Sequence, residues 1–199
     1  MKYCLIFFIS LCTCFAATAQ QDWKLAKDKD GIKVFLASRE DSKFKSIRVE
    51  CVLDGTISKL ISILENVSGH PGWVYKTKKA NLLKQVNFLD FIYYSESNMP
   101  WPVSNRDGVY HLKINYDTAH NILHVNASAE PAFVPKNEGI VRVPYSKASW
   151  YVTEAKNKLT IDYTFEVDPG GSLPAWMVNM FADKGPYETF SKLSSMLKE

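Results

Sequence analysis

The sequence has little cysteine outside its first residues. Three of its four cysteines lie within the first 14 residues, and Cys51 is the only one in the remainder of the chain. A single thiol can form neither an internal disulfide nor a cysteine-based zinc site. Cys51 falls on the apolar side of an expected strand, which favours a buried packing role over a reactive thiol.

The chain also lacks an excess of charge of one sign. It carries 24 basic and 21 acidic side chains, and removal of Lys2 with the segment described below lowers the net charge from +3 to +2. This balance does not resemble the concentrated basic face of a nucleic-acid binder. Four lysines nevertheless crowd one segment. They are expected to form a solvated strand face, with contact to anionic lipid headgroups as the alternative, and they are Lys76, Lys78, Lys79 and Lys84.

Catalytic signatures are missing as well. The sequence contains no Gly-x-Ser-x-Gly elbow, no His-Glu-x-x-His pair and no phosphate-binding loop. The histidines are interpreted as solvated or capping residues, with His70 in a turn, His111 on a polar strand face, and His120 and His124 separated by strand geometry. We therefore expect no catalytic residue, no metal site and no cofactor.

Only one long apolar run is present, and it lies at the amino terminus. Lys2 precedes an almost uninterrupted apolar stretch over residues 3–16, followed by the small residues Ala17-Thr18-Ala19. This run is short for a membrane span, and the pattern is typical of an export signal cut after Ala19. We expect residues 1–19 to be a signal peptide and residues 20–199 to be one domain, exported to a periplasm or out of the cell.

The middle of the domain alternates as strands, with helical patterns near its two ends. Leu159 to Val167 is the clearest strand, because apolar and polar residues exchange at every position. This distribution indicates an α+β class rather than a parallel sheet. The expected helices cover residues 22–29 and the segment from Ile57 to Val67, ended by His70-Pro71-Gly72. The expected strands cover 31–39, 44–53, 74–84, 88–97, 106–116, 122–129, 139–154 with an interruption, and 159–167.

The last element is expected to be a helix that starts at Leu173-Pro174, with Ser172 available as its cap. Its apolar side continues past Gly185-Pro186, where Pro186 should kink or divide it. The first half is expected to face a ligand and the second half to anchor the helix through Phe190, Leu193 and Leu197.

Three segments together resemble the START domain family, within the START and Bet v 1-like superfamily. Residues 168–179, Asp-Pro-Gly-Gly-Ser-Leu-Pro-Ala-Trp-Met-Val-Asn, resemble the approach to the last helix of that family. Residues 100–107, Pro-Trp-Pro-Val-Ser-Asn-Arg-Asp, resemble its proline-rich segment and Arg-Asp pair, and Trp23 with residues 30–34 resembles its opening. The three occur in the expected order from about Trp23 to Leu197, as in a bacterial-type exported member.

The resemblance implies a helix-grip fold. A curved antiparallel sheet would wrap a long C-terminal helix and leave an internal hydrophobic tunnel for one lipid or other apolar molecule. The family has a gate loop that leans on the last helix, and residues 117–121 are matched to it.

Strand parity then suggests which side chains line the tunnel. Arg106 shares a strand face with Tyr110, Leu112 and Ile114, and its buried charge should pair with Asp107, with Glu96 or with an anionic headgroup. The apolar Leu112 and Ile114 favour a ligand with little polar chemistry at its deep end. The expected ligand-binding residues are Arg106, Tyr110, Leu112, Ile114, Tyr163, Phe165, Trp176, Met177, Met180 and Phe181.

The leading hypothesis is a non-enzymatic, monomeric carrier or sensor of a lipid, with transient membrane contact and no nucleic-acid partner. A helix-grip enzyme of the cyclase or hydrolase kind, using the same cavity, is the first alternative. A partner-binding module with a cavity filled by side chains is the second.

Overall fold

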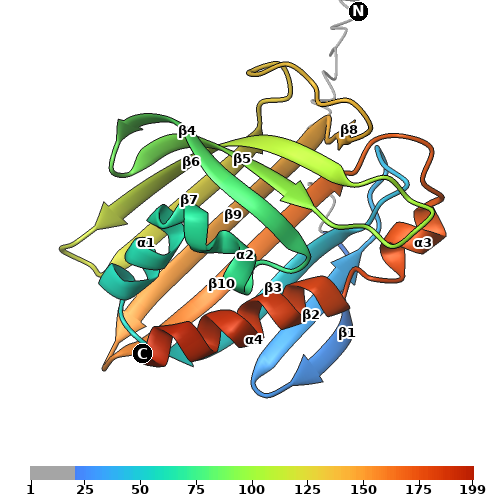
Figure 1. Cartoon of the computed structure of the whole chain (residues 1–199). Coiled ribbons are helices and arrows are strands. Elements are labelled where there is room, and N and C mark those ends of the chain that lie inside the picture. Colours follow the sequence, from blue (N-terminus) through green and yellow to red (C-terminus); the bar gives the residue numbers. More distant parts are fainter. Residues whose placement is uncertain (1–20) are drawn as a thin grey trace, which may run out of the picture.

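The computed structural model describes residues 21–199, so the expected signal peptide and its cleavage after Ala19 lie outside the described residues. Ten strands form one curved sheet, and nine of them follow the order β1-β2-β3-β10-β9-β7-β6-β5-β4 (Figure 1). All neighbours in this order are antiparallel, and the short β8 pairs in parallel with the start of β6. The strands are β1 (Lys24–Lys29), β2 (Ile32–Ala37), β3 (Ser46–Asp54), β4 (Thr77–Asn87), β5 (Asp90–Ser97), β6 (Arg106–Asp117), β7 (Ile122–Ala129), β8 (Val141–Arg142), β9 (Tyr145–Ala155) and β10 (Lys158–Asp168).

Helices cover one face of this sheet (Figure 1). The long α4 packs on β2 and β3, whereas α2 and the 3-10 turn η1 pack on the edge strand β4. This arrangement confirms the expected α+β class and the helix-grip fold. The helices are α1 (Ile57–Glu65), η1 (Val67–Gly69), α2 (His70–Trp73), α3 (Ala175–Asn179) and α4 (Lys184–Lys198).

The core lies between the sheet and α4. Phe190 is 1% exposed, and its ring lies 5.1 Å from the Trp150 ring and 5.3 Å from the Tyr163 ring, centroid to centroid. Leu193 and Leu197 are buried one and two turns later. These three residues therefore anchor the helix, as expected, and Cys51 is a buried core residue, also as expected. Burial raises the pKa of its thiol to about 12.

Two expectations about local structure are wrong. Residues 24–29 form β1 instead of a helix, because the turn at Asp30 and Gly31, with φ of 53° and 75°, returns the chain to pair with β2. His70 does not lie in a solvated turn. It belongs to α2, is 4% exposed, and its Nε2 lies 2.9 Å from the carbonyl oxygen of Leu64.

The last helix is divided, as expected, but at a different place. α3 ends at Asn179 and α4 begins at Lys184, so Gly185 and Pro186 lie in the first turn of α4. The N–H groups of a helix's first turn have no carbonyl partner within the helix. Proline lacks an N–H group, so Pro186 costs the first turn of α4 no hydrogen bond. Ser172 does not cap α3, whose N-cap is Pro174.

Thr56 caps α1 through its hydroxyl, which accepts the Lys59 amide at 3.2 Å. We expect Thr56→Ala to lower the free energy of unfolding by about 1 kcal/mol, because one amide of the first turn loses its acceptor. Urea denaturation checks this value. The exposed Thr118, in the turn after β6, provides the control; an equal loss from Thr118→Ala would contradict the capping role.

Candidate functional site: the inner face of the sheet

The inner face of the sheet is the face toward the helices. One half of it is sealed, which means here that its side chains are buried in the packed core. Trp150 identifies this face because it contacts Phe190 of α4. Leu112 and Ile114 are 4% and 7% exposed on the same face, so these two expected ligand residues belong to the packed core. Their neighbours on the face are large and apolar, namely Phe91, Leu123, Val125, Val152, Leu159 and Ile161.

The other half of the inner face carries small side chains. It lies toward the α3 end of the sheet, defined here as the end where β6 begins at Arg106 and β10 finishes at Asp168. Strand pairing places a strip of small residues there, and we call it the small-residue strip: Ser95, Ser97, Gly108, Ala127, Ala129, Ser146 and Ala148. Small side chains on the concave side of a curved sheet fill less of the space toward its helices than the large residues of the other half do.

Aromatic residues surround this strip. The rings of Tyr93 and Tyr110 lie 5.4 Å apart, and those of Tyr163 and Phe165 are stacked at 6.2 Å. All four are only partly buried, unlike the sealed residues farther along the same strands. Burial raises the pKa of Tyr110 to about 12 and raises those of Tyr93 and Tyr163 as well. All three phenols are therefore neutral, and their hydroxyl groups add polar atoms to this half of the face.

Gly108 is required where Tyr110 folds back along β6. A Cβ at position 108 would lie 2.2 Å from the Tyr110 hydroxyl oxygen, well inside van der Waals contact. The absence of a side chain at 108 thus lets the Tyr110 ring lie along the inner face.

Arg106 occupies the α3 end of the same face, and its expected carboxylate partners are engaged elsewhere. The Asp107 carboxylate accepts a hydrogen bond from Arg142 at 2.7 Å, and Glu96 accepts bonds from Lys78 and Asn105, both at 2.9 Å. Of the three partners expected for Arg106, only the anionic headgroup is left.

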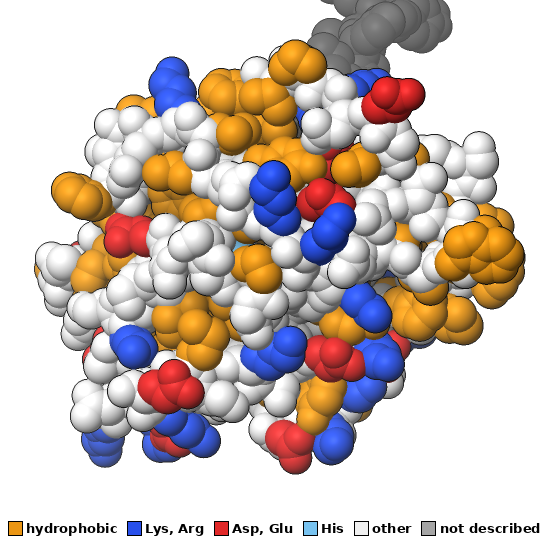
Figure 2. Space-filling model, in the orientation of Figure 1, with side chains coloured by type: hydrophobic (Ala, Val, Ile, Leu, Met, Phe, Trp, Pro, Cys, Tyr) orange, Lys and Arg blue, Asp and Glu red, His pale blue; other side chains and the backbone are white. Residues whose placement is uncertain are grey.

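The α3 residues expected to face a ligand lie at the surface. No residue of α3 is fully buried, and Met177 is half-buried. Trp176 is 65% exposed, and Met180 and Phe181 are also exposed, as is Trp101 in the β5–β6 loop at the same end. Hydrophobic surface gathers over the region of α3 in Figure 2. α3 contacts the β2–β3 loop, where Asn179 accepts a hydrogen bond from the Lys45 amide.

Residues 117–121, expected to form a gate against the last helix, do not lie beside α3. They make the turn between β6 and β7, at the opposite end of the sheet. Asp117 there accepts hydrogen bonds from the amides of Ala119 and His120. The β5–β6 loop, residues 98–105, is the connection that lies at the α3 end.

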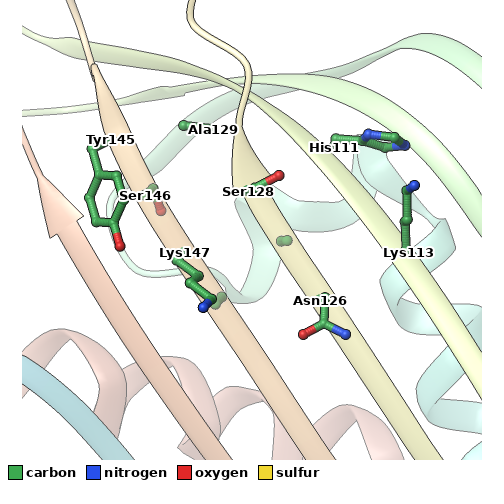
Figure 3. A pocket seen from close by; sticks show the side chains of 10 residues that line it. His111, Lys113, Asn126, Ser128, Ala129, Tyr145, Ser146 and Lys147 are labelled. Atoms are coloured by element: carbon green, nitrogen blue, oxygen red, sulfur yellow. The ribbon is translucent and has the colours of Figure 1, made fainter.

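A separate hollow of about 250 Å³ lies on the outer face of the sheet. Figure 3 shows polar side chains from β6, β7 and β9 around it, among them His111, Asn126 and Lys147. The His111 Nε2 atom lies 2.5 Å from an Asp90 oxygen. The lysines of residues 76–84 are also outside, exposed as expected, and Lys78 pairs with Glu96.

Sequence reasoning missed Tyr93 and His70. The His70 ring lies 5.2 Å from that of Tyr93 and 5.5 Å from that of Trp73, centroid to centroid. Burial lowers the pKa of His70, so its imidazole is neutral. Tyr93 pairs with Tyr110 across β5 and β6, which puts both rings on one face, but this register is set by the fold and is not visible in the sequence.

Residues 21–199 contain no group of three or more potential metal ligands. Within the same part of the chain, no helix combines the length and the apolar character needed to cross a membrane.

Comparison with known proteins agrees with this geometry. The START domain model matches residues 15–199. An uncharacterized protein of Pseudomonas aeruginosa is 35% identical over 176 residues, covering 88% of this chain and 86% of that protein. The phosphatidylcholine transfer protein of Mus musculus is 27% identical over 171 residues, covering 82% and 78% respectively. A crystal structure of a STAR-related lipid transfer protein from Xanthomonas axonopodis superposes with a TM-score of 0.82 at 31% identity, over 89% of this chain and 99% of that one. The chain thus belongs to the START domain family.

Proposed function

We propose that the protein binds one lipid between the inner face of its sheet and its helices, and transfers it between membranes without chemical change. The observation that carries this proposal is the small-residue strip, bordered by partly buried aromatic residues, on a face that is otherwise sealed. Such a space suits an acyl chain, because removing apolar surface from water contributes about 25 cal/mol per Å². Family membership supports the same ligand class.

An enzymatic role has less support from the inner face. The titratable groups found there are phenols with raised pKa, a neutral His70 and Arg106. The Asp107 carboxylate, whose charge acts on Tyr110, is held by two hydrogen bonds from Arg142. Acid–base chemistry needs a group whose pKa lies near the working pH, in reach of the reacting atom. A lipid carrier needs no acid–base group of this kind, and we propose the non-enzymatic role for this reason.

Exposed aromatic residues at the α3 end suit transient contact with a membrane. Trp101 and Trp176 are 92% and 65% exposed, and Lys43 and Lys45 lie in the loop that α3 contacts. Trp is well suited to the interface between headgroups and acyl chains, and lysine to anionic headgroups. We propose that a monomer meets the membrane at this end and exchanges its lipid there. The pattern of residues 1–19 supports export, so the membranes concerned would lie beyond the cytoplasm.

A transfer assay tests this proposal. Fluorescent phosphatidylcholine, chosen because a relative is named for it, would move from donor to acceptor vesicles. We expect the double variant Trp101→Ser, Trp176→Ser to slow the transfer about tenfold, because two indole rings no longer enter the interface. Uptake of the same lipid without vesicles should change little.

Phe88→Ser is the matched control, because Phe88 is 76% exposed at the opposite end of the sheet, in the β4–β5 hairpin. Equal slowing by Phe88→Ser would contradict contact through the α3 end. Absence of any transfer by the wild-type protein, over a broad panel of lipids, would contradict the carrier function itself.

A further inference from the structure

Two arginines are buried at the α3 end, and their surroundings are opposite. Arg106 is 7% exposed and Arg142 is 6% exposed. Arg142 donates two hydrogen bonds to the Asp107 carboxylate and three to the carbonyl oxygens of Pro131, Val134 and Pro135. Its charge is neutralised and its donors are satisfied. The same cannot be said of Arg106.

Within the described part of the chain, the Arg106 guanidinium has one hydrogen bond, from Nη1 to the carbonyl oxygen of Ser104. Its Nε is buried and has no partner among residues 21–199. No carboxylate in that part of the chain lies within ion-pair distance of it, as Asp107 and Glu96 are engaged by other cations. Burial lowers the pKa of Arg106, whereas the hydrogen bond to Asp107 raises the pKa of Arg142. An arginine nevertheless keeps its proton at any physiological pH.

A buried cation without an anion destabilises the folded protein, even after the surroundings relax. Buried charges in proteins are therefore paired or bind a ligand. The donors that remain on Arg106 also suit a ligand, because Nε and Nη2 lie on one edge of the guanidinium and can bind two oxygens of one anion side by side.

The position of Arg106 places its side chain at one end of the proposed lipid space. Arg106 precedes Gly108 and Tyr110 on the inner face of β6. The loop backbone at Gly171 lies beside its guanidinium. A Cβ on Gly171 would lie 3.7 Å from Nη2, and Gly171 has a φ of 68°, a conformation that favours glycine. The guanidinium thus lies where the small-residue strip reaches the α3 end.

We propose that Arg106 binds the anionic group of the ligand, a phosphate or a carboxylate, at the α3 end, while the acyl part lies along the small-residue strip toward Tyr163. This inference rests on the proposed lipid-binding function. It adds the requirement that the ligand carries an anionic group, which an apolar space alone does not impose. It also sets the orientation of the ligand, with the charged group near the exposed Trp176 and the acyl chain inside.

Three fluorescent probes with the same labelled acyl chain test the proposal. One is phosphatidylcholine, which has a phosphodiester, one is a fatty acid, and one is a diacylglycerol without an anionic group. Each is offered on cyclodextrin to the wild-type protein, to Arg106→Gln and to Lys113→Gln. Lys113 is the matched control, because it carries a positive charge on the outer face of the same strand, with its side chain 62% exposed.

We expect Arg106→Gln to bind at least one anionic probe about tenfold more weakly or worse, since the charge-assisted hydrogen bonds to the anion are lost. Its affinity for diacylglycerol should stay within about twofold, and Lys113→Gln should match the wild type for all probes. Loss for phosphatidylcholine alone would identify a phosphate, and loss for the fatty acid alone would identify a carboxylate. Equal losses for all three probes, or no loss for either anionic probe, would overturn the proposal.

A measurement on the wild-type protein alone covers the case in which Arg106→Gln does not fold. The wild type should bind its preferred anionic probe about tenfold more tightly than diacylglycerol, and equal affinities would overturn the anion site. Wild-type protein that takes up none of the probes would instead refute the lipid-binding function, so the two failures are distinct.

Discussion

Replacement of Asp107 by alanine is expected to lower the free energy of unfolding by about 3–5 kcal/mol, because it leaves the Arg142 guanidinium charged and buried without its anion. Both side chains are almost completely inaccessible, at 0% and 1% exposure, and the Nε to Oδ1 distance is 2.7 Å. Arg142 also holds the carbonyl oxygens of Pro131, Val134 and Pro135. Urea denaturation of both proteins measures the difference.

Asp54→Ala is the control for this prediction, because Asp54 forms an equally short but exposed pair with Lys158, at 2.6 Å. It should cost less than about 1 kcal/mol. If Asp107→Ala were no more destabilising than Asp54→Ala, the buried pair would not have the role assigned to it.

The Asp107 effect should also depend on pH. Burial alone would raise the pKa of Asp107, but hydrogen bonds from Arg142 and Asn137 outweigh it and leave the pKa lowered. A carboxylate with a lowered pKa in the folded state contributes stability above its unfolded pKa of about 3.9, and this is lost as the pH falls through the folded value. The difference in stability between wild type and Asp107→Asn should accordingly be full at pH 7 and shrink as the pH falls below about 4.

Most strands could be predicted from the sequence because the inner face of the sheet is dry and much of its outer face is wet. β10 shows why: Leu159 and Ile161 are buried, whereas Lys158 and Thr160 are exposed. β1 could not be predicted in the same way. It is an edge strand with mostly exposed residues, so no apolar alternation marks it, and its pairing with β2 depends on the turn at Asp30 and Gly31.

Parity along single strands predicted part of the candidate site. It placed Arg106 and Tyr110 on one face, and the structure agrees, but it could not separate the sealed Leu112 from the partly accessible Tyr110. That difference depends on which helix covers each position. Strand parity also could not predict ion-pair partners, since Asp107 and Arg142 are 35 residues apart in the chain. The small-residue strip emerges only when β5, β6, β7 and β9 are set side by side.

Filling the small-residue strip should abolish lipid binding without unfolding the protein. Ala148 lies on the inner face of β9, opposite Ala127 on β7 and Phe165 on β10. Ala148→Phe would occupy the space assigned to the acyl chain. Each methylene group of the lipid that is displaced from the site makes the free energy of binding less favourable by about 0.8 kcal/mol. Displacement of two methylene groups therefore already weakens binding by more than about tenfold. Ala155→Phe, at the exposed end of the same strand, is the matched control.

Binding and stability of Ala148→Phe, measured on the same preparation by lipid titration and urea denaturation, test the lipid space most directly. The lipid space predicts that lipid binding is lost while the free energy of unfolding is unchanged or higher, because the new ring enters an unoccupied volume. If side chains already fill the inner face, the ring must overpack it at a cost of about 1–3 kcal/mol. That loss of stability, together with lipid binding that matches the Ala155→Phe control, would contradict the existence of the site.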